Sequence, residues 1–303
     1  MKKVLVLYYS QSGQLKEVVD SFISKLPDEE IKVDLQKIEP KRAYPYPWPF
    51  YEFFDEFPES VYLDGCEVKE LEDVEDDYDL IILGYTVWFL SPSLPITGFL
   101  KSPQAKRLLK DKPVITVIAC RDMWVMAQEK MKRLLEGVEA RLIDNVVLTD
   151  QGKSIYTFFT TPRWLLTGKK DRFYFFPPAG IAKEEIAAAS RFGARINEAL
   201  KQDEERKLQP LLRGLGAVNA NGKLIATEKI ATRSFMIWGK LIKLSGPKYS
   251  LGRKVTITVY SIFLLTLVLS IVPLNIIIRK LLYPLQKDKI ALLEEYYEQP
   301  SGK

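Results

Sequence analysis

The sequence predicts an α/β fold in which five parallel strands form a doubly wound sheet, followed by a C-terminal helical segment that associates with a membrane. Three observations support this prediction. Short runs of Val, Ile and Leu alternate with segments of helical periodicity over residues 1–200, as expected for strands that helices cover on both faces. Small polar loops follow several of these runs, and a run of 24 uncharged residues lies near the C-terminus.

Five apolar runs have the length of buried strands. The first of them is too short for the core of a signal peptide, and no small-residue cleavage site follows it. The third and fourth are apolar at almost every position, which is typical of central strands in a parallel sheet. The predicted strands are Lys3–Tyr9, Ile31–Ile38, Leu80–Gly84, Pro113–Ala119 and Arg141–Leu148.

Segments between these strands have the spacing of helices that bury one face. In the first of them, Leu15, Val18, Val19 and Phe22 recur at helical intervals. Because parallel strands end at the same edge of a sheet, ligands of such folds bind at that edge. The predicted helices are Gln14–Leu26, Ile96–Leu109, Met123–Leu135 and Ala182–Leu200.

The composition narrows the chemistry. The chain of 303 residues has no histidine and two cysteines, Cys66 and Cys120. These counts exclude triads that use histidine, metal sites with imidazole ligands, cysteine-rich zinc sites and disulfide frameworks. We therefore expect no metal site, and the reaction chemistry must come from a cofactor or from Asp, Glu, Tyr, Arg, Lys, Ser and Cys side chains.

The loop after the first strand has the composition of a phosphate site. It reads Ser10-Gln11-Ser12-Gly13-Gln14 and runs directly into a helix, whose free N–H groups and dipole favour an anion. The loop lacks the lysine of a P-loop and the three glycines of a dinucleotide site, so it suits a single phosphate without a metal. An ordinary serine and glycine turn that caps the helix is the alternative.

Three strand-end loops together resemble the flavodoxin-like family. The first is similar to its mononucleotide phosphate loop, although Leu15 replaces the usual final threonine. Residues 84–95 resemble the proline-rich second flavin loop of flavin-dependent NAD(P)H oxidoreductases, and residues 120–124 stand where the third loop would lie. The resemblance implies that FMN is bound by Ser10, Gln11, Ser12, Gly13, Gln14, Thr86, Val87, Trp88, Phe89, Cys120, Arg121 and Trp124.

The whole chain is similar to a narrower group, the dialkylresorcinol-condensing enzymes. The opening KVLVLYYSQSGQL, the loop CRDMW, the length near 300 residues and the apolar C-terminal segment carry this resemblance. It implies that a ketosynthase partner builds an alkylated cyclohexanedione. The flavin-dependent member would then oxidise this lipophilic dione to the aromatic resorcinol.

Oxidation of such a substrate needs a group that accepts a proton. Without histidine, the candidates are Asp122, Tyr85 and the thiolate of Cys120, with Arg121 stabilising an enolate oxygen. Asp122 is equally suited to cap the following helix, Arg121 to contact flavin carbonyls, and Cys120 to fill a small core position. Two aromatic residues are suited either to stack on the flavin or to form a hydrophobic rim, namely Trp88 and Trp124.

Residues 40–62 form an insertion after the second strand that is rich in proline and aromatic residues. Connections of this length without a clear helical or strand pattern are uncommon and are often functional. Two interpretations are equally open. The insertion either lines an apolar substrate entrance and covers the flavin, or it packs over the edge of the sheet as a structural extension.

The C-terminal third has the features of a membrane anchor. Val255–Ile278 contains no charged residue and is long enough to span a bilayer core, although a buried core helix is the alternative. Residues 201–254 are basic and include aromatic side chains, which suits an anionic cytoplasmic leaflet better than nucleic acid. Residues 151–303 hold 25 Lys and Arg against 12 Asp and Glu, whereas residues 1–150 hold 19 against 27.

These observations predict four segments: an FMN-binding domain over residues 1–200, a basic segment over 201–254, a membrane-embedded helix over 255–278 and a polar tail over 279–303. We expect a membrane-associated, FMN-dependent oxidoreductase at the cytoplasmic face of the plasma membrane, with lipid and a lipophilic small molecule as partners. Two alternatives are an electron-transfer flavoprotein that serves a membrane partner, and a flavin-free scaffold that binds a ketosynthase.

Overall fold

The structure, a computed structural model, describes residues 1–271 and 287–299 of the chain. Its centre is one sheet with the strand order β2-β1-β3-β5-β6, in which all neighbours are parallel. This is the flavodoxin-like order of doubly wound sheets, so the predicted fold class is confirmed. A sixth, two-residue strand, β4, pairs antiparallel with the end of β3. The strands are β1 (Lys2–Tyr8), β2 (Ile31–Lys37), β3 (Leu80–Trp88), β4 (Ser91–Pro92), β5 (Pro113–Cys120) and β6 (Arg141–Thr149).

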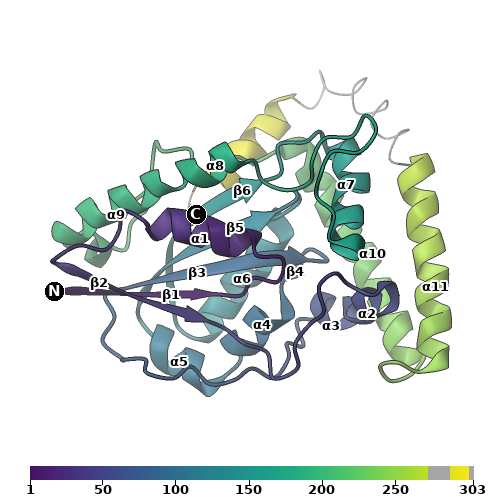
Figure 1. Cartoon of the computed structure of the whole chain (residues 1–303), viewed down its shortest axis with the longest axis horizontal. Coiled ribbons are helices and arrows are strands. Elements are labelled where there is room, and N and C mark those ends of the chain that lie inside the picture. Colours follow the sequence, from purple (N-terminus) through teal and green to yellow (C-terminus); the bar gives the residue numbers. More distant parts are fainter. Residues whose placement is uncertain (272–286, 300–303) are drawn as a thin grey trace.

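Helices cover both faces of the sheet (Figure 1). One face carries α1, α8 and α9, and the other carries α4, α5 and α6. The apolar stripe of α1 is fully inside, since Leu15, Val18, Val19 and Phe22 are at most 1% exposed; each such side chain contributes about 1.5–3 kcal/mol by burial. The bounds are α1 (Gln14–Ile23), α4 (Leu94–Leu100), α5 (Pro103–Leu109), α6 (Val125–Gly137), α8 (Lys183–Ala188) and α9 (Ser190–Lys201).

The remaining helices gather beyond the carboxyl ends of the strands, on the right of Figure 1, except for a short 3₁₀ turn, η1, after α9. The insertion of residues 40–62 supplies two of them, so no long helix covers the sheet between β2 and β3. Residues 287–298 form one more helix. The bounds are α2 (Phe50–Asp55), α3 (Phe57–Val61), α7 (Ser154–Thr167), η1 (Glu204–Lys207), α10 (Gly222–Leu244), α11 (Leu251–Thr266) and the π-helical turn η2 (Leu267–Ile271).

Several predicted boundaries are corrected by the structure. The single helix predicted over Ile96–Leu109 is two helices, because Ser102 caps a new helix at Pro103, with its Oγ accepting from the N–H of Ala105 at 3.1 Å. The strand predicted to end at Gly84 continues to Trp88. The helix predicted over Ala182–Leu200 is divided at Ala189 into α8 and α9.

The basic segment, for which the sequence pattern predicted no fold, forms η1, α10 and the start of α11. The predicted membrane helix coincides with α11 and η2 as far as residue 271, and its last residues, 272–278, lie outside the described part of the chain. Within the described residues, Leu251–Ser270 is long and apolar enough to cross a membrane by length and composition.

Candidate functional site

Three loops meet at the carboxyl edge of the sheet. They follow β1, β3 and β5, and the chain leaves β1 and β3 toward opposite faces, which makes the gap between these two strands the switch point of the fold. Ligands of open α/β sheets bind at such a point. The three sequence segments predicted to form one site are therefore brought together.

The first loop turns into α1 at Gly13. Its φ angle of 89° is in the left-handed region, which glycine adopts at no steric cost. A Cβ at this position would meet nothing within 4 Å, so the space above the loop is open. The first-turn N–H groups of α1 have no intrahelical acceptor. One local acceptor is Ser10 Oγ, which lies 3.3 Å from the N–H of Lys16, and the side chain of Ser12 is exposed.

Two other segments hold the side chains of this loop. The amide of Gln11 donates to the main-chain oxygen of Pro45 at 2.7 Å and accepts from the indole N–H of Trp48 at 2.9 Å. On the other side, the amide of Gln14 lies 3.5 Å from the carbonyl oxygen of Ile181. The side chains of Gln11 and Gln14 are thus engaged with the protein, which leaves main-chain groups and the serines for a ligand.

The second loop is a tight hairpin. Phe89 and Leu90 connect β3 to β4 with φ angles of 48° and 57°, a left-handed pair typical of two-residue hairpins but rare for bulky residues. The ring of Phe89 packs against Phe53 at 4.7 Å and Phe57 at 5.1 Å, and these contacts stabilise the turn. Thr86 precedes the turn, and its buried Oγ1 has no hydrogen-bond partner in the described residues.

Trp88 is 8% exposed because aromatic rings surround it. Tyr9, Tyr44 and Trp48 lie 5.9, 5.2 and 5.5 Å from it, all close to edge-on. The structure therefore places Trp88 in the core, as in the hydrophobic alternative, and Trp124 likewise is 5% exposed. The same contacts show that the insertion packs directly over the first and second loops.

The third loop carries the polar groups of the site. Arg121 donates to Asp122 Oδ1 through Nε at 2.9 Å, and its Nη2 forms an ion pair with the same oxygen at 2.8 Å. The guanidinium lies 4.1 Å from the ring of Phe158. The second carboxylate oxygen of Asp122 is buried and has no hydrogen-bond partner in the described residues. Asp122 does not cap α6, since Trp124 occupies the N-cap position. The carboxylate can accept a proton on its unpartnered oxygen, and the guanidinium beside it can contact an anion.

Burial disfavours two of the predicted proton acceptors. Tyr85 is fully buried within the sheet, where its hydroxyl donates to Gln128 Oε1 at 2.7 Å, and burial raises its pKa well above the ordinary value. Burial also raises the pKa of the Cys120 thiol, which donates to the carbonyl oxygen of Asp122 at 3.3 Å. Tyr85 is therefore placed away from any ligand, which corrects its assignment as a catalytic residue. Cys120 is half-buried, and the raised pKa of its thiol disfavours a thiolate. Asp122 stays the proposed proton acceptor of the site.

The sequence analysis missed Glu228, which lies below the third loop. This residue of α10 is 1% exposed, and its Oε2 accepts from the N–H of Met126 at 2.8 Å. It thereby caps α6 from a helix about a hundred residues away in the chain. Burial, together with the nearby charge of Asp122, raises the pKa of Glu228 to about 8. No local pattern signals this role, because the contact depends on how α10 folds back over the sheet edge.

Asp150 and Lys130 were also missed. Asp150 follows β6 and accepts from the N–H groups of Gly152 and Gly180, both at 2.7 Å, which joins the end of the sheet to the loop beside Gln14. Lys130 of α6 donates to Ser91 Oγ at 2.7 Å and supports the hairpin of the second loop. Burial lowers the pKa of Lys130 to about 8.

In the described residues, no three Cys, Asp or Glu side chains are grouped to hold a metal ion.

No protein-family model and no curated protein matches the chain. Among solved structures, a flavoprotein of Lactobacillus acidophilus in complex with FMN is 22% identical over 48% of this chain and 93% of its own, with a TM-score of 0.40. An archaeal flavodoxin is 13% identical over 66% of this chain and 99% of its own, with a TM-score of 0.34. A flavone reductase is 14% identical over 67% of this chain and 64% of its own, with a TM-score of 0.36. The fold is assigned from the strand order of the chain itself.

Proposed function

We propose that this protein is a membrane-associated, FMN-dependent oxidoreductase. The observation that carries the proposal is the switch point itself, where the open N-terminus of α1 at Gly13 meets the hairpin after β3 and the polar loop after β5 in a flavodoxin-like sheet. Two buried oxygens at this edge, Thr86 Oγ1 and Asp122 Oδ2, have no protein partner in the described residues. Unsatisfied buried polar atoms are rare and call for a ligand or water, so the residues present fit a flavin.

The phosphate of FMN would lie on the N-terminus of α1, beside Ser10, Ser12 and Gly13. Thr86 on the second loop and Arg121 on the third would contact the polar edge of the ring system. When bound, FMN supplies an acceptor for two electrons, which no side chain of this composition can provide. The role of the protein's own residues is then to position the substrate, to exclude water and to move a proton.

A lipophilic cyclic dione is the substrate class that we favour, on the resemblance to the dialkylresorcinol-condensing enzymes. Conversion of a cyclohexanedione to a resorcinol removes two hydrogens from the ring, one as a hydride that the oxidised cofactor takes up and one as a proton. Asp122 would hold this proton, and Arg121 would stabilise the negative charge that develops on the enolate oxygen. A ketosynthase that builds the dione would be the upstream partner.

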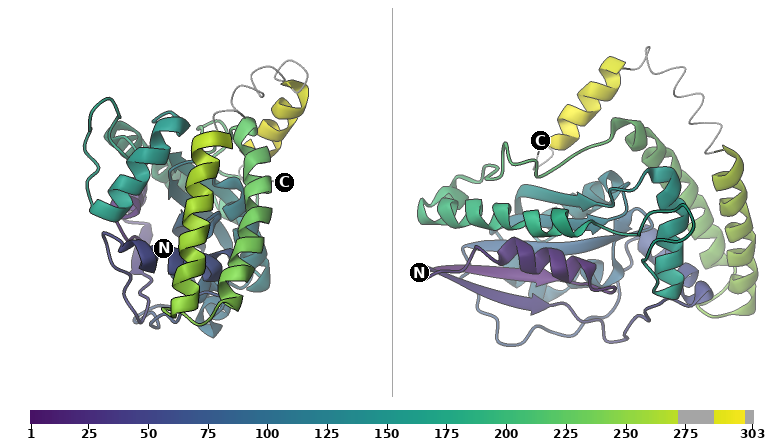
Figure 2. Two further views of the ribbon diagram at one scale, coloured as in Figure 1. Left: turned by 90° about the vertical axis from the view of Figure 1, so that its right-hand side faces the viewer. Right: turned by 45° about the horizontal axis from the view of Figure 1, so that its top comes forward.

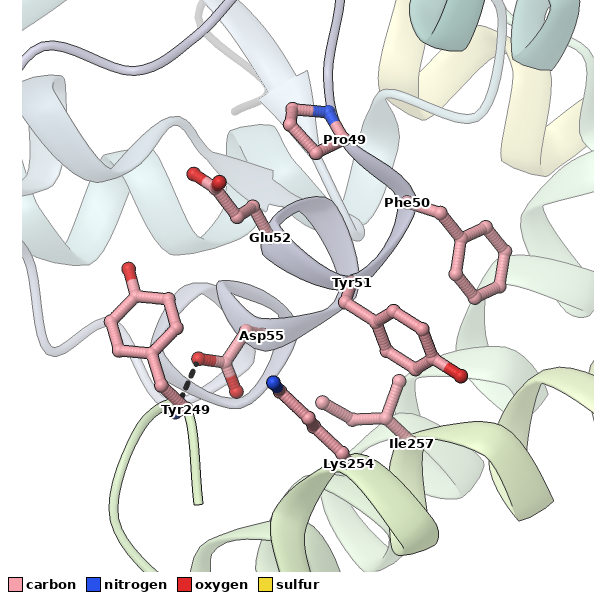
Figure 3. A pocket seen from close by; sticks show the side chains of 8 residues that line it. All are labelled: Pro49, Phe50, Tyr51, Glu52, Asp55, Tyr249, Lys254 and Ile257. Carbon is pink, nitrogen blue, oxygen red and sulfur yellow. Dashed lines mark hydrogen bonds between the residues drawn. The ribbon is translucent and has the colours of Figure 1, made fainter. Parts of the chain in front are cut away.

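Aromatic surroundings support a lipophilic substrate. A cavity of about 270 Å³ lies between α2 and α11, lined on one side by Phe50, Tyr51 and Ile257 and on the other by charged side chains (Figure 3). From this cavity, ring contacts continue toward the second loop through Phe54, which lies 4.8 Å from Phe50 and 6.3 Å from Phe89. This arrangement suits the binding of an apolar ring near the carboxyl edge.

An electron-transfer flavoprotein is the second candidate. The rings of Tyr44 and Trp48 cover Trp88 and fill the space over the second loop. This favours electron transfer, because a protein that only exchanges electrons needs no substrate cavity beside its flavin.

The purified full chain in detergent separates these functions. Bound flavin gives an absorbance band near ~450 nm, and the proposed enzyme decolourises it anaerobically with an alkylated cyclohexanedione and releases the resorcinol. Reoxidation only by a protein acceptor, with no reaction of the dione, supports electron transfer instead. A colourless protein that does not take up added FMN leaves the flavin-free scaffold.

A further inference from the structure

Helices α10 and α11 form an antiparallel hairpin beyond the carboxyl edge of the sheet, and they lie side by side in Figure 2. Trp238 of α10 contacts Tyr260 and Phe263 of α11, with ring centroids 5.3 and 5.1 Å apart. Ser250 caps α11, since its Oγ accepts from the N–H of Arg253 at 3.3 Å. The two helices are therefore one unit.

The inner side of α11 is fastened to the folded domain along several turns. Arg253 is 2% exposed and donates to Asp55 Oδ1 at 2.6 Å and to Glu59 Oε2 at 2.7 Å. Two turns further on, Tyr260 is 1% exposed and stacks on Phe57 at 4.7 Å. Separation of α11 from the domain would leave Asp55 without its cation. Breaking a buried ion pair of this kind is strongly unfavourable.

The outer side of the hairpin is apolar and exposed. On α10 the exposed apolar residues recur at helical intervals, so they form one stripe. On α11 they predominate on the side that faces away from the domain, where Lys254, Thr266 and Ser270 are also exposed. We call these residues the outer apolar face. Its members are Ile230, Ile237, Leu241, Leu244, Leu251, Val255, Val259, Ile262, Leu265 and Leu269.

Positive charges border this face along α10. Lys229, Arg233 and Lys240 are exposed, and in the described residues none of them has a carboxylate within ion-pair distance. A basic border beside an apolar face is complementary to a bilayer with anionic headgroups. The basic border disfavours a dimer of this chain through the same face, because the like charges of the two borders would be brought together.

We propose that the α10–α11 hairpin lies in the plane of one leaflet and binds an anionic membrane through its outer apolar face, while its inner side stays on the domain. This inference deepens the membrane association that forms part of the proposed function. If α11 crossed the bilayer, α2, α3 and α10, which cover three turns of it, would enter the hydrocarbon core together with the acidic side chains of Asp55 and Glu59. Because the hairpin stands at the carboxyl edge, docking brings the candidate site close to the membrane surface.

Flotation with lipid vesicles tests the surface. The purified full chain should float with phosphatidylcholine vesicles that contain phosphatidylserine, and more weakly with phosphatidylcholine alone. Ile237→Glu combined with Ile262→Glu should reduce the bound fraction at least tenfold with flavin content unchanged. Leu35→Glu is the matched control, because Leu35 is an exposed apolar residue of β2, outside the hairpin.

The depth of a fluorescent probe in the bilayer distinguishes a helix that lies in the plane of one leaflet from a helix that crosses the bilayer. A fluorophore on Leu251→Cys or on Leu269→Cys, quenched by nitroxide lipids and corrected for labelling of the parent chain, should report the same depth for both positions. A depth that increases along the helix by about 1.5 Å per residue would overturn docking in the plane and leave membrane association intact. If the parent chain does not float, or if the outer apolar face proves to hold a second copy by light scattering, the inference fails, while bound flavin still decides the redox function.

Discussion

Asp122 is held at the end of β5 with one carboxylate oxygen on Arg121 and the other buried without a partner in the described residues. Its side chain is 14% exposed, so it is reachable from the candidate site while most of its surface is shielded from water. Tyr85 lacks this combination because it is fully buried, and the half-buried Cys120 has a thiol whose pKa is raised by burial. We therefore propose Asp122 as the proton acceptor at this edge.

The substitution Asp122→Asn should slow oxidation of a cyclic dione by about 100-fold or more, because general base catalysis contributes at least this much, whereas FMN should still bind. Stopped-flow measurement of flavin reduction by the dione checks the rate. Asp73→Asn is the control, since Asp73 is an exposed residue before the start of β3, at the opposite end of that strand from the second loop. An unchanged reduction rate in Asp122→Asn would remove this residue from the mechanism.

Glu228 gives the fold a pH dependence. Burial raises its pKa from 4.5 to about 8, so between these pH values the folded chain holds a proton that the unfolded chain has lost. Stability therefore falls as pH rises through this window, with a limiting slope of about 1.4 kcal/mol per pH unit. Below the unfolded pKa the contribution no longer changes with pH.

The variant Glu228→Gln keeps the acceptor for Met126 and cannot ionise. Relative to the parent chain, its free energy of unfolding should increase steadily between pH 5 and pH 8, as measured by chemical denaturation at several pH values. Glu198→Gln, at an exposed position of α9, should follow the parent curve. Parallel curves for the parent and Glu228→Gln would mean that Glu228 is already ionised in the folded chain at neutral pH.

At the scale of elements, the insertion of residues 40–62 both covers and braces the site. The indole N–H of Trp48 donates to Gln11 in the first loop. The rings of Tyr44 and Trp48 pack against Trp88 in the second loop. The insertion also packs α2 and α3 against the hairpin through Arg253 and its acidic partners. One segment thus connects the phosphate loop with the proposed membrane face.

The substitution Trp48→Phe keeps an aromatic ring and removes the hydrogen bond to Gln11. We expect the chain to lose about 1 kcal/mol of stability and to bind FMN several-fold more weakly, as measured by fluorescence titration. Trp238→Phe, which changes the hairpin and not the loop, should leave FMN affinity unaltered. Equal affinities for the parent and Trp48→Phe would show that the brace does not preorganise the first loop.

At the scale of the whole molecule, the sequence was sufficient for features that depend on local patterns. Continuous apolar runs identified the five parallel strands, and a Ser/Gly segment before a helix identified the loop at Gly13. The burial of Trp88 and the cap that Glu228 provides for α6 could not be predicted, because they depend on contacts between segments 40 or more residues apart. The end of β3 was misplaced for a different, local reason, since its last residues pair with β4 across a two-residue turn.

The candidate site and the elements around it gather at the carboxyl edge of the sheet. The three site loops, the aromatic insertion and the α10–α11 hairpin all lie there (Figure 1). If the proposed function holds, this placement would give a lipophilic substrate a short route from a membrane to the switch point. It depends on one central claim, that the N-terminus of α1 holds the phosphate of FMN.

Binding of FMN and of riboflavin to Ser12→Glu and Ser12→Gln tests that claim most directly. The two variants have side chains of equal size at an exposed position and differ in one negative charge, which would repel the phosphate across a few ångströms. The account predicts that Ser12→Glu binds FMN at least tenfold more weakly than Ser12→Gln, while the two bind riboflavin equally. Equal FMN affinities in the two variants would contradict the assignment of this loop as the phosphate site.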